Sequence, residues 1–506
     1  MEFAIIFLSL AFMGAILVLC HELVVKPMKL RARLSQQGIH GPPPSLLFGN
    51  IREIKKARFA VVKDPRPSST HNCAALLFPF FQQWRKQYGE VFAFSLGNTQ
   101  ILFVNQPDAV KEIATCTSLA LGKPSYQQKE FGTLLGQGIL TSNGAVWVHQ
   151  RKILAPELYM DKVKGMMDQI IDSTFTVIES WKTRIEAERG LADIKIDEYM
   201  RSFSGDVISK ACFGSSYSRG EEIFLKLRDL QEALSKKSLY TGVPVMRYLP
   251  TKGNREAWAV EKEIRDLILQ VVKERKMASY EEDLLQMVVE GAKNTYLSQE
   301  ATERFIVDNC KNIYLAGYET TAVSATWCLM LLAVNQEWQH NVRKEVLEIS
   351  RGRTLDADML RKMKQLTMVI QESLRLYPPV AIVSREALDD MKFGEIFVPK
   401  GVDIWLMVLA LHTDPEIWGK DAYTFDPNRF AKGIVGASKL PQAYMPFGVG
   451  PRVCLGQNLA MVELKLVIAL LLCNFSFTLS PNYTHSPVLR LVIEPENGVR
   501  LLVKKL

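Results

Sequence analysis

The feature that most constrains this chain is a cysteine set in a glycine-rich loop near its C-terminal end. Residues 446–456 read PFGVGPRVCLG, and an apolar helix is predicted to follow from Leu455 to Leu472. Gly448 and Gly450 permit a tight loop whose backbone amides can approach a sulfur atom. Cys454 is therefore expected at the start of a helix, where the helix dipole and free N–H groups lower the thiol pKa and keep the sulfur anionic.

A thiolate in this position is suited to be the axial ligand of a haem iron. It donates electron density toward the distal ligand and so favours O–O cleavage. Arg452, two residues earlier, can turn toward a haem propionate. The alternative is that Cys454 is one more buried thiol, the usual fate of a lone cysteine. The surrounding pattern F-x-x-G-x-R-x-C-x-G is complete in this chain, which favours the ligand.

A second motif, residues 316–321 with the sequence AGYETT, lies inside a long helical segment predicted from Ser298 to Ala333. A glycine and two hydroxyls inside a helix loosen its hydrogen-bond ladder and leave room for ordered water. Glu319 and Thr320 then form an acid–alcohol pair that can pass protons to bound dioxygen. Taken alone, the motif would indicate no more than solvated or capping side chains.

Together the two motifs resemble the cytochrome P450 family, and the resemblance covers the whole chain after its first residues. It implies a mainly α fold with small β-sheets, in which haem b (iron protoporphyrin IX) lies between the oxygen-activating long helix and the cysteine-loop helix. In that family the cysteine matching Cys454 binds the iron, and the residues matching Glu319 and Thr320 are catalytic. Haem-thiolate isomerases and dehydratases commonly lack this pair, so its presence favours O2-dependent monooxygenase chemistry over an isomerase, a dehydratase or a membrane-bound haem sensor.

The resemblance also implies residues that hold the haem. Trp147 and Arg151 match the family's W-x-x-x-R motif and stand one helical turn apart. Arg385, ten residues after Arg375, matches another position that contacts a propionate. With Arg452, these arginines would neutralise the two propionates in a dry site. His149 and His412 are read as ordinary histidines because sulfur already fills the axial position.

Glu372 and Arg375 place opposite charges three residues apart on one predicted helix face. Alone, such a pair indicates a surface ion pair worth a few tenths of a kcal/mol. The family resemblance implies instead a folding triad that Arg429 completes from the segment FDPNRF, residues 425–430. This triad is expected to support the cysteine loop and to take no part in catalysis.

Strand signals occur near both ends of the chain, and helical periodicity dominates between 107 and 377, as in Asp161–Arg184. Val91–Asn105 predicts a hairpin that turns at Gly97-Asn98. Further strands are predicted at Val380–Ser384, Ile396–Val398 and Val402–Val408. A last hairpin is predicted to pair Leu489–Ile493 with Val499–Val503.

Phe3–Cys20 is an uncharged apolar run just long enough to cross a bilayer as a helix. Basic residues follow it between Lys26 and Arg33, so the positive-inside rule places the bulk of the chain in the cytosol. We expect a single-pass protein of the endoplasmic reticulum membrane, with an anchor at 1–25, a basic and Pro-rich linker at 26–50 and a haem-binding monooxygenase domain at 51–506. The alternative is a secretory signal that is removed.

Composition excludes other classes of protein. The net charge of +8 is modest for 506 residues, and no basic stripe with interleaved aromatics predicts nucleic-acid binding. The eight cysteines include no C-x-x-C pair, which indicates reduced thiols and no zinc site. Because no nucleotide-binding glycine motif is present, electrons are expected from a separate NADPH-dependent flavoprotein reductase, for which Lys152, Lys162 and Lys164 are candidate docking charges.

The finer resemblance is to plant microsomal enzymes. Residues 122–126, 136–142 and 150–167 are similar to a subfamily that acts on gibberellins and related ent-kaurane diterpenoids, and close relatives oxidise triterpenoids. The resemblance implies a distal pocket lined by Leu134–Leu140, Ala316, Val380–Val383 and Pro481–Leu489. This set is largely apolar and suits a small apolar terpenoid, but it does not distinguish hydroxylation from epoxidation.

Overall fold

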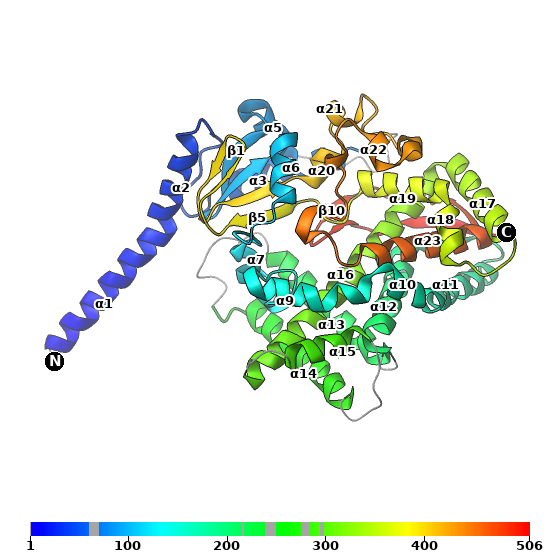
Figure 1. Cartoon of the computed structure of the whole chain (residues 1–506), viewed down its shortest axis with the longest axis horizontal. Coiled ribbons are helices and arrows are strands. Elements are labelled where there is room, and N and C mark those ends of the chain that lie inside the picture. Colours follow the sequence, from blue (N-terminus) through cyan, green and yellow to red (C-terminus); the bar gives the residue numbers. More distant parts are fainter. Residues whose placement is uncertain (1, 60–69, 215–216, 238–248, 276–282, 294–297) are drawn as a thin grey trace.

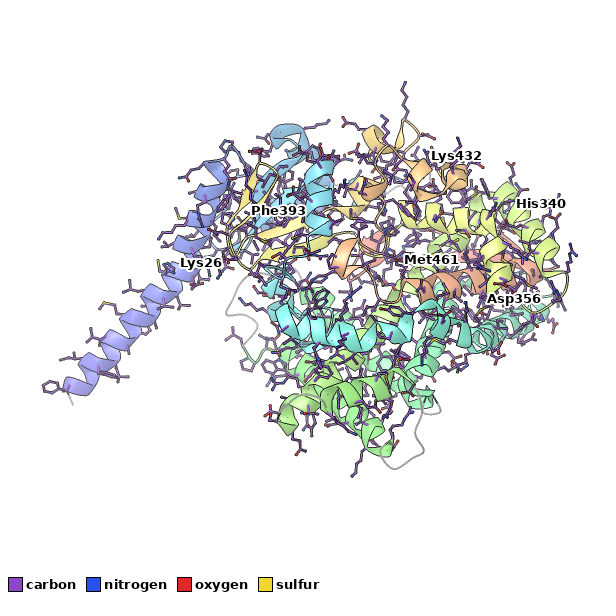
Figure 2. The ribbon with its side chains drawn as sticks, in the orientation of Figure 1. Lys26, His340, Asp356, Phe393, Lys432 and Met461 are labelled. Atoms are coloured by element: carbon purple, nitrogen blue, oxygen red, sulfur yellow. The ribbon has the colours of Figure 1, made fainter. Side chains whose placement is uncertain are left out.

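The N-terminal arm is one continuous helical rod. In the computed structural model, which describes residues 2–59, 70–214, 217–237, 249–275, 283–293 and 298–506, α1 (Glu2–Cys20) runs through a π-helical turn (His21–Val25) into α2 (Lys26–Ser35). Figure 1 shows α1 projecting away from the body, and Lys26 lies where the rod approaches the β-rich part of the molecule (Figure 2). The N-terminal part of the rod is apolar and long enough to cross a membrane. One other described helix, α23 (Gln457–Asn474), passes the same test but is largely buried in the core.

The base of the rod is packed against the body. Leu34 is completely buried in an apolar cluster with residues of the large sheet. An Nη2 group of Arg31 donates hydrogen bonds to the carbonyl oxygens of Gly41 (3.0 Å) and Pro42 (2.7 Å), which lie in the Pro-rich segment. Arg33 pairs with Asp390 at 3.0 Å. These contacts define how the apolar rod leaves the domain.

The large sheet has five strands in the order β1-β2-β8-β5-β3, with β2 and β8 parallel and the other neighbours antiparallel. The predicted hairpin at Val91–Asn105 is confirmed as β1 and β2, which turn at Gly97-Asn98. The predicted strand at Ile396–Val398 is confirmed as β7, which pairs with β6. The strands of these two sheets are β1 (Val91–Leu96), β2 (Thr99–Val104), β3 (Leu121–Gly122), β5 (Val383–Ala387), β6 (Met391–Phe393), β7 (Ile396–Val398) and β8 (Asp403–Leu406).

The prediction of a final hairpin was wrong. β10 (Pro487–Leu489) pairs with β11 (Ile493–Pro495), whereas β12 (Arg500–Lys505) lies between β9 (Phe475–Leu479) and β4 (Ala192–Lys195). Leu501 and Val503 of β12 are fully buried there. A strand with two partners satisfies both of its hydrogen-bonding edges, which a local hairpin would leave half open.

Helices make up most of the molecule, as predicted, and α16 runs through its centre (Figure 1). Its N-cap is Ser298, whose hydroxyl accepts the Ala301 N–H. The long helices are α9 (Gly144–Leu154), α11 (Met167–Ala187), α12 (Ile196–Phe213), α13 (Tyr217–Lys237), α14 (Lys252–Arg275), α16 (Gln299–Val334), α17 (Gln336–Ser350), α19 (Lys364–Leu376) and α23. The shorter helices are α3 (Ile51–Phe59), α4 (Cys73–Leu77), α5 (Pro79–Tyr88), α6 (Pro107–Thr115), α7 (Ser125–Glu130), α8 (Gly132–Leu135), α10 (Met160–Gly165), α15 (Leu284–Lys293), α18 (Ala357–Lys362), α20 (Val408–His412), α21 (Pro415–Trp418) and α22 (Gly433–Ala437).

Two predicted helices have different bounds. The segment Asp161–Arg184 is split into α10 and α11, because α10 ends at Gly165 and α11 starts afresh at Met167. The helix after the cysteine begins at Gln457 and not at Leu455. Cys454 therefore lies three residues before the helix, in the loop that leads into it.

Candidate active site

The loop that carries Cys454 folds tightly back on itself. The Cys454 N–H donates to the Phe447 carbonyl oxygen at 2.9 Å, and the Val453 N–H donates to that of Gly450 at 3.1 Å. Gly448 and Gly450 have φ of 69° and 75°, a region that favours glycine. A methyl group on Gly450 would lie 2.4 Å from the Ala114 carbonyl oxygen at the end of α6, so this position also requires glycine for close packing.

As a whole residue Cys454 is exposed, whereas Cys73, Cys212, Cys310 and Cys328 are buried in the core. Removal of water by the surrounding protein raises the pKa of the Cys454 thiol, while the Gly456 N–H and the Arg151 guanidinium lower it. The predicted net lowering of this pKa is thus wrong for the protein alone, because desolvation outweighs the two local contributions. Coordination of a metal ion deprotonates a thiol outright, so the site still suits a thiolate ligand.

The predicted haem-binding residues gather around the indole of Trp147 on α9. The guanidinium of Arg452 lies 4.2 Å from the centre of this ring, and that of Arg151 lies 5.7 Å away. Arg385 on β5 lines the same indentation as Trp147 and Arg452. Arg151 also donates to the Val453 carbonyl oxygen at 3.0 Å, which ties α9 to the residue before Cys454. The four residues thus come together beside the cysteine loop.

Lys123, which sequence reasoning did not select, belongs to this cation cluster. Its backbone N–H donates to Asn143 Oδ1 (2.6 Å), and the same oxygen accepts Arg452 Nη2 (3.0 Å). Burial, with repulsion from Arg385 and Arg452, lowers the pKa of Lys123 to about 7. The signal that could have identified Lys123 is its place directly after the edge strand β3, within residues 122–126, a segment that resembles the plant enzymes.

The charges of this cluster provide a test of whether a haem fits. Burial lowers the pKa of Arg385 to about 10. The pKa of Arg452 is also lowered to about 10, by burial and by repulsion from Arg385 and Arg151. Within the described ranges, no carboxylate pairs with either arginine or with Lys123. Buried cations are costly unless they are paired. A ligand with two carboxylates, such as the propionates of haem, fits this surplus of positive charge.

The central helix α16 carries the second motif without interruption. The Thr320 hydroxyl donates to the Ala316 carbonyl oxygen at 2.7 Å, which is the predicted back-bond to the preceding turn. α16 nevertheless remains α-helical from end to end. Gly317 serves close packing: its carbonyl oxygen accepts the Ser204 hydroxyl at 2.9 Å, and a methyl group on it would lie 2.6 Å from the side chain of Ile208 on α12.

Glu319 has partners that the sequence did not reveal. Its carboxylate lies 3.5 Å from Arg201 Nε, and Arg201 also forms a short ion pair with Glu494 of β11, which in turn contacts Arg490. Burial raises the pKa of Glu319; Arg201 opposes this shift and Glu494 adds to it. Glu319 and Thr320 therefore have different hydrogen-bonding surroundings, with the acid in a buried ion network and the alcohol on its own helix.

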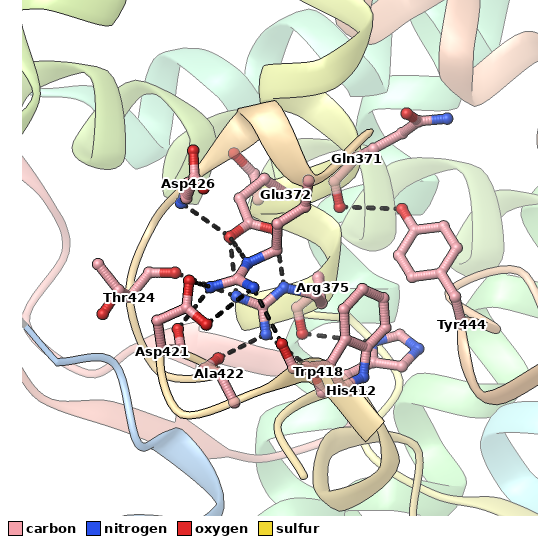
Figure 3. A network of polar contacts seen from close by, with 12 residues as sticks. Gln371, Glu372, Arg375, His412, Trp418, Asp421, Ala422, Thr424, Asp426 and Tyr444 are labelled. Atoms are coloured by element: carbon pink, nitrogen blue, oxygen red, sulfur yellow. Dashed lines mark hydrogen bonds and ion pairs between the residues drawn. The ribbon is translucent and has the colours of Figure 1, made fainter. Parts of the chain in front are cut away.

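The three residues of the predicted folding triad come together, and Figure 3 shows Glu372 and Arg375 side by side within their network of polar contacts. Arg375 binds Glu372 through two hydrogen bonds of 2.7 and 2.8 Å, and both side chains are completely buried. Arg429 Nε lies 3.5 Å from Glu372 Oε1, and Arg429 also pairs with Asp421 at 2.5 Å. Arg375 further donates to three backbone carbonyl oxygens, those of His412, Ala422 and Thr424.

His412 connects this triad to the cysteine loop. Its Nε2 accepts the Met445 N–H at 2.9 Å, just before the loop begins, and its carbonyl oxygen accepts Arg375 Nη1 at 2.8 Å. Burial and the nearby Arg375 lower the pKa of His412 to about 3, so the imidazole is neutral and can accept. Sequence reasoning treated His412 as an ordinary histidine and missed this role.

The fold is mainly helical, a glycine-rich loop presents a thiol, and the cation cluster beside this loop fits a ligand with two carboxylates. Together these features are those of a haem-thiolate protein. The family model for cytochrome P450 matches residues 70–503. Cytochrome P450 714C2 from Oryza sativa subsp. japonica is 52% identical over 95% of this chain and 94% of its own length. Cytochrome P450 714B3 from Zea mays is 45% identical (99% and 96%), and cytochrome P450 714A2 from Arabidopsis thaliana is 43% identical (95% and 94%).

The chain belongs to the cytochrome P450 family. It is an oxidoreductase with monooxygenase activity, and its cofactor is haem b bound through a cysteine thiolate. Like other members, it uses O2, a redox partner and a hydrophobic substrate. Monooxygenase activity is the reading that the Glu319-Thr320 pair favoured over an isomerase, a dehydratase or a sensor.

Proposed function

We propose that this P450 inserts one atom of O2 into a small apolar terpenoid, a gibberellin or a related ent-kaurane diterpenoid, by hydroxylation or epoxidation. The observation that carries the chemistry is the cation cluster beside the Cys454 loop. The substrate class is supported by the apolar character of Leu134–Leu140 and Val380–Val383 and by the resemblance to plant microsomal enzymes. A triterpenoid is the second candidate, since the same apolar lining would suit it.

In this proposal each part of the site has its own task. Bound haem supplies the activation of O2 and the transfer of one oxygen atom. Cys454 holds the iron, and the cations around Trp147 hold the propionates: Arg151, Arg385 and Arg452. The guanidinium groups of these arginines would form charge-assisted hydrogen bonds with the propionates.

Proton delivery is proposed for Glu319 and Thr320. The raised pKa of Glu319 allows its carboxyl to hold a proton closer to neutral pH, where a general acid is effective. Thr320 can turn its hydroxyl away from the Ala316 carbonyl to orient water. Arg201 competes for the Glu319 carboxylate, so the acid has to loosen from its ion pair before it delivers a proton.

The chain is proposed to be anchored in the endoplasmic reticulum membrane by residues 1–25, with 51–506 as the cytosolic monooxygenase domain and 26–50 as the connection. The apolar helix α1 and the basic residues of α2 support this topology. An NADPH-dependent flavoprotein reductase would dock near α9 and α10. Lys162 and Lys164 there are in ion pairs with Glu157 and Asp161, whereas Lys152 is exposed.

The test is a screen of microsomes that contain this protein and a plant reductase against gibberellins, ent-kaurenoic acid and pentacyclic triterpenoids. Mass spectrometry should detect a diterpenoid product that has gained one oxygen atom and whose formation requires NADPH. A product from triterpenoids alone would replace the proposed substrate with the second candidate. Oxidation of neither class would refute the terpenoid assignment.

A further inference from the structure

Three polar side chains of α16 hold the loop of residues 136–143, and the proposed chemistry does not use them. Each accepts one backbone N–H of the loop: Asp308 Oδ2 accepts that of Gln137 (2.8 Å), Asn309 Oδ1 that of Ile139 (3.1 Å) and Asn312 Oδ1 that of Leu140 (2.8 Å). Asn312 also donates to the Leu135 carbonyl oxygen at 2.7 Å. All three side chains are buried, so the contacts are shielded from competing water.

The two glycines of the loop allow this close approach. A methyl group on Gly136 would lie 2.1 Å from the Asp308 carboxylate, and one on Gly138 would lie 2.6 Å from Asn312 Oδ1. Gly136 also has φ of 55°, which favours glycine. The loop therefore has a glycine at each of the two positions where a side chain would collide with Asp308 or Asn312 of α16.

A buried lysine extends the same arrangement to a third element. Lys311, with 1% of its side chain exposed, pairs with Asp308 at 3.0 Å and with Glu261 of α14 at 3.4 Å. Its Nζ also donates to the Thr133 carbonyl oxygen, just before the loop, at 3.2 Å. The charge of Asp308 is thus neutralised within the core, and the loop is positioned relative to both α14 and α16.

The far end of the loop contacts the proposed cofactor clamp. Arg452 donates to the Ser142 carbonyl oxygen at 3.2 Å and to Asn143 Oδ1 at 3.0 Å. Between the two ends, Gln150 of α9 donates to the Gln137 carbonyl oxygen at 2.9 Å. The loop is therefore a braced connection between α16 and the arginine that precedes Cys454.

We propose that Asp308, Asn309 and Asn312 are positioning residues that determine substrate fit, because they fix the place of Ile139 and Leu140 in the wall of the distal pocket. Ile139 and Leu140 are half-buried and apolar, and the backbone N–H of each is one that α16 holds. This inference rests on the proposed function in so far as that function assigns the loop to the pocket. It does not depend on which terpenoid is oxidised.

The test uses the full-length holoprotein and the variant Asn309→Ala. Asn309 is the cleanest position because its own Nδ2 donates within α16, to Phe305, and its loss frees one loop amide. Deuterium exchange of peptides covering residues 136–142 should become about tenfold faster, since one hydrogen bond is worth roughly that factor. Clotrimazole, a bulky apolar azole, should bind about tenfold more weakly, as followed by the Soret shift, because the pocket wall is no longer held in place. Imidazole, which is too small to need the wall, should bind as in the wild type.

Thr326→Val is the matched control. Thr326 is buried on the same helix and donates to its own Ala322 carbonyl oxygen at 2.8 Å, so this variant also loses one hydrogen bond. Exchange in the loop and binding of both azoles should stay unchanged. If Asn309→Ala does not retain haem, Gly138→Ala perturbs the neighbouring contact between Asn312 and the loop from the loop side and should give the same two changes.

Unchanged loop exchange in these variants would overturn the inference, and so would faster exchange with unaltered clotrimazole binding. Neither result bears on the substrate class, because azole binding requires no turnover. Conversely, a protein that shows the expected exchange and azole changes but oxidises no terpenoid would refute the proposed function and leave this inference standing.

Discussion

Replacement of Arg375 by alanine tests whether the Glu372–Arg375 ion pair contributes strongly to the stability of the fold because it is buried. The side chain of Arg375 is completely buried, and its five donated hydrogen bonds go to the Glu372 carboxylate and to the three carbonyl oxygens of His412, Ala422 and Thr424. The variant leaves Glu372 as a buried charge whose remaining contacts are the Asp426 N–H at 2.9 Å and Arg429 at 3.5 Å.

The expected loss is large. Removal of one partner from a buried ion pair costs about 3–5 kcal/mol, and each buried carbonyl that loses its donor adds to this. Native domains are stable by about 5–15 kcal/mol in total. We therefore expect Arg375→Ala to lower the free energy of unfolding by about 4 kcal/mol or more and to release the cysteine loop, since the His412 carbonyl oxygen and the Met445 N–H belong to the same network.

The measurement is chemical denaturation followed by circular dichroism, together with the reduced carbon monoxide spectrum as a readout of thiolate-bound haem. Arg361→Ala is the control, because Arg361 and Asp358 have the same spacing of three residues and a similar distance, 2.6 Å, but are 79% and 70% exposed. Exposed pairs contribute about 0–1 kcal/mol, so this variant should keep both its stability and its spectrum.

Equal stability of the two variants would refute the claim that burial distinguishes them. If Arg375→Ala yields no folded protein, Arg429→Gln gives a milder test, since Arg429 contacts Glu372 at 3.5 Å. It should lower stability by less than Arg375→Ala yet by more than Arg361→Ala. Retention of full stability in Arg429→Gln would count against the triad.

Four further predictions follow from the site and the topology. Cys454→Ser should lose the red-shifted Soret band of the reduced carbon monoxide complex and retain little haem, and an unchanged spectrum would contradict the assigned ligand. Thr320→Ala should bind haem and substrate normally but slow proton delivery by ~10²–10⁴, so that the ratio of product formed to NADPH consumed falls and hydrogen peroxide rises; unchanged coupling would contradict the role of Thr320. Asn482, exposed in the sequon Asn482-Tyr483-Thr484, should carry no sugar if the domain is cytosolic, and a mobility shift on endoglycosidase treatment would show the opposite orientation. Burial and Arg375 lower the pKa of His412 from 6.5 to about 3, so the stability that its neutral form contributes above pH 6.5 is lost as the pH falls, by about 1.4 kcal/mol per pH unit. In urea denaturation between pH 6.5 and 4.5, the free energy of unfolding of His412→Gln should therefore depend less steeply on pH than that of the wild type.

Local features of this protein could be predicted from the sequence because near neighbours in the chain determine them. The hairpin around Gly97-Asn98 depends on turn residues beside alternating apolar ones, and α16 depends on a long periodic segment with Ser298 at its start. The tight loop before Cys454 follows from the conformational freedom of Gly448 and Gly450. Each of these predictions concerns contacts within a few residues, and each agrees with the structure.

Which charged and polar groups are shielded from water, and which residues far apart in the chain pair with each other, depends on the tertiary structure. Arg375 and Arg361 cannot be told apart by spacing, yet one is fully buried and the other exposed, because segments far along the chain cover the first. The pKa of Cys454 is raised where its local sequence predicted a lowering, since the surrounding fold removes water from the thiol.

The same reason explains the partners that sequence reasoning missed. Arg201 reaches Glu319 from α12, and Lys123 joins the arginine cluster from the end of β3. β12 pairs with β9 and β4, not with its neighbour in sequence, because those two strands bury both of its edges. Local conformational preferences act over one or two turns of chain, whereas burial and the strength of charge interactions depend on everything that packs around a group.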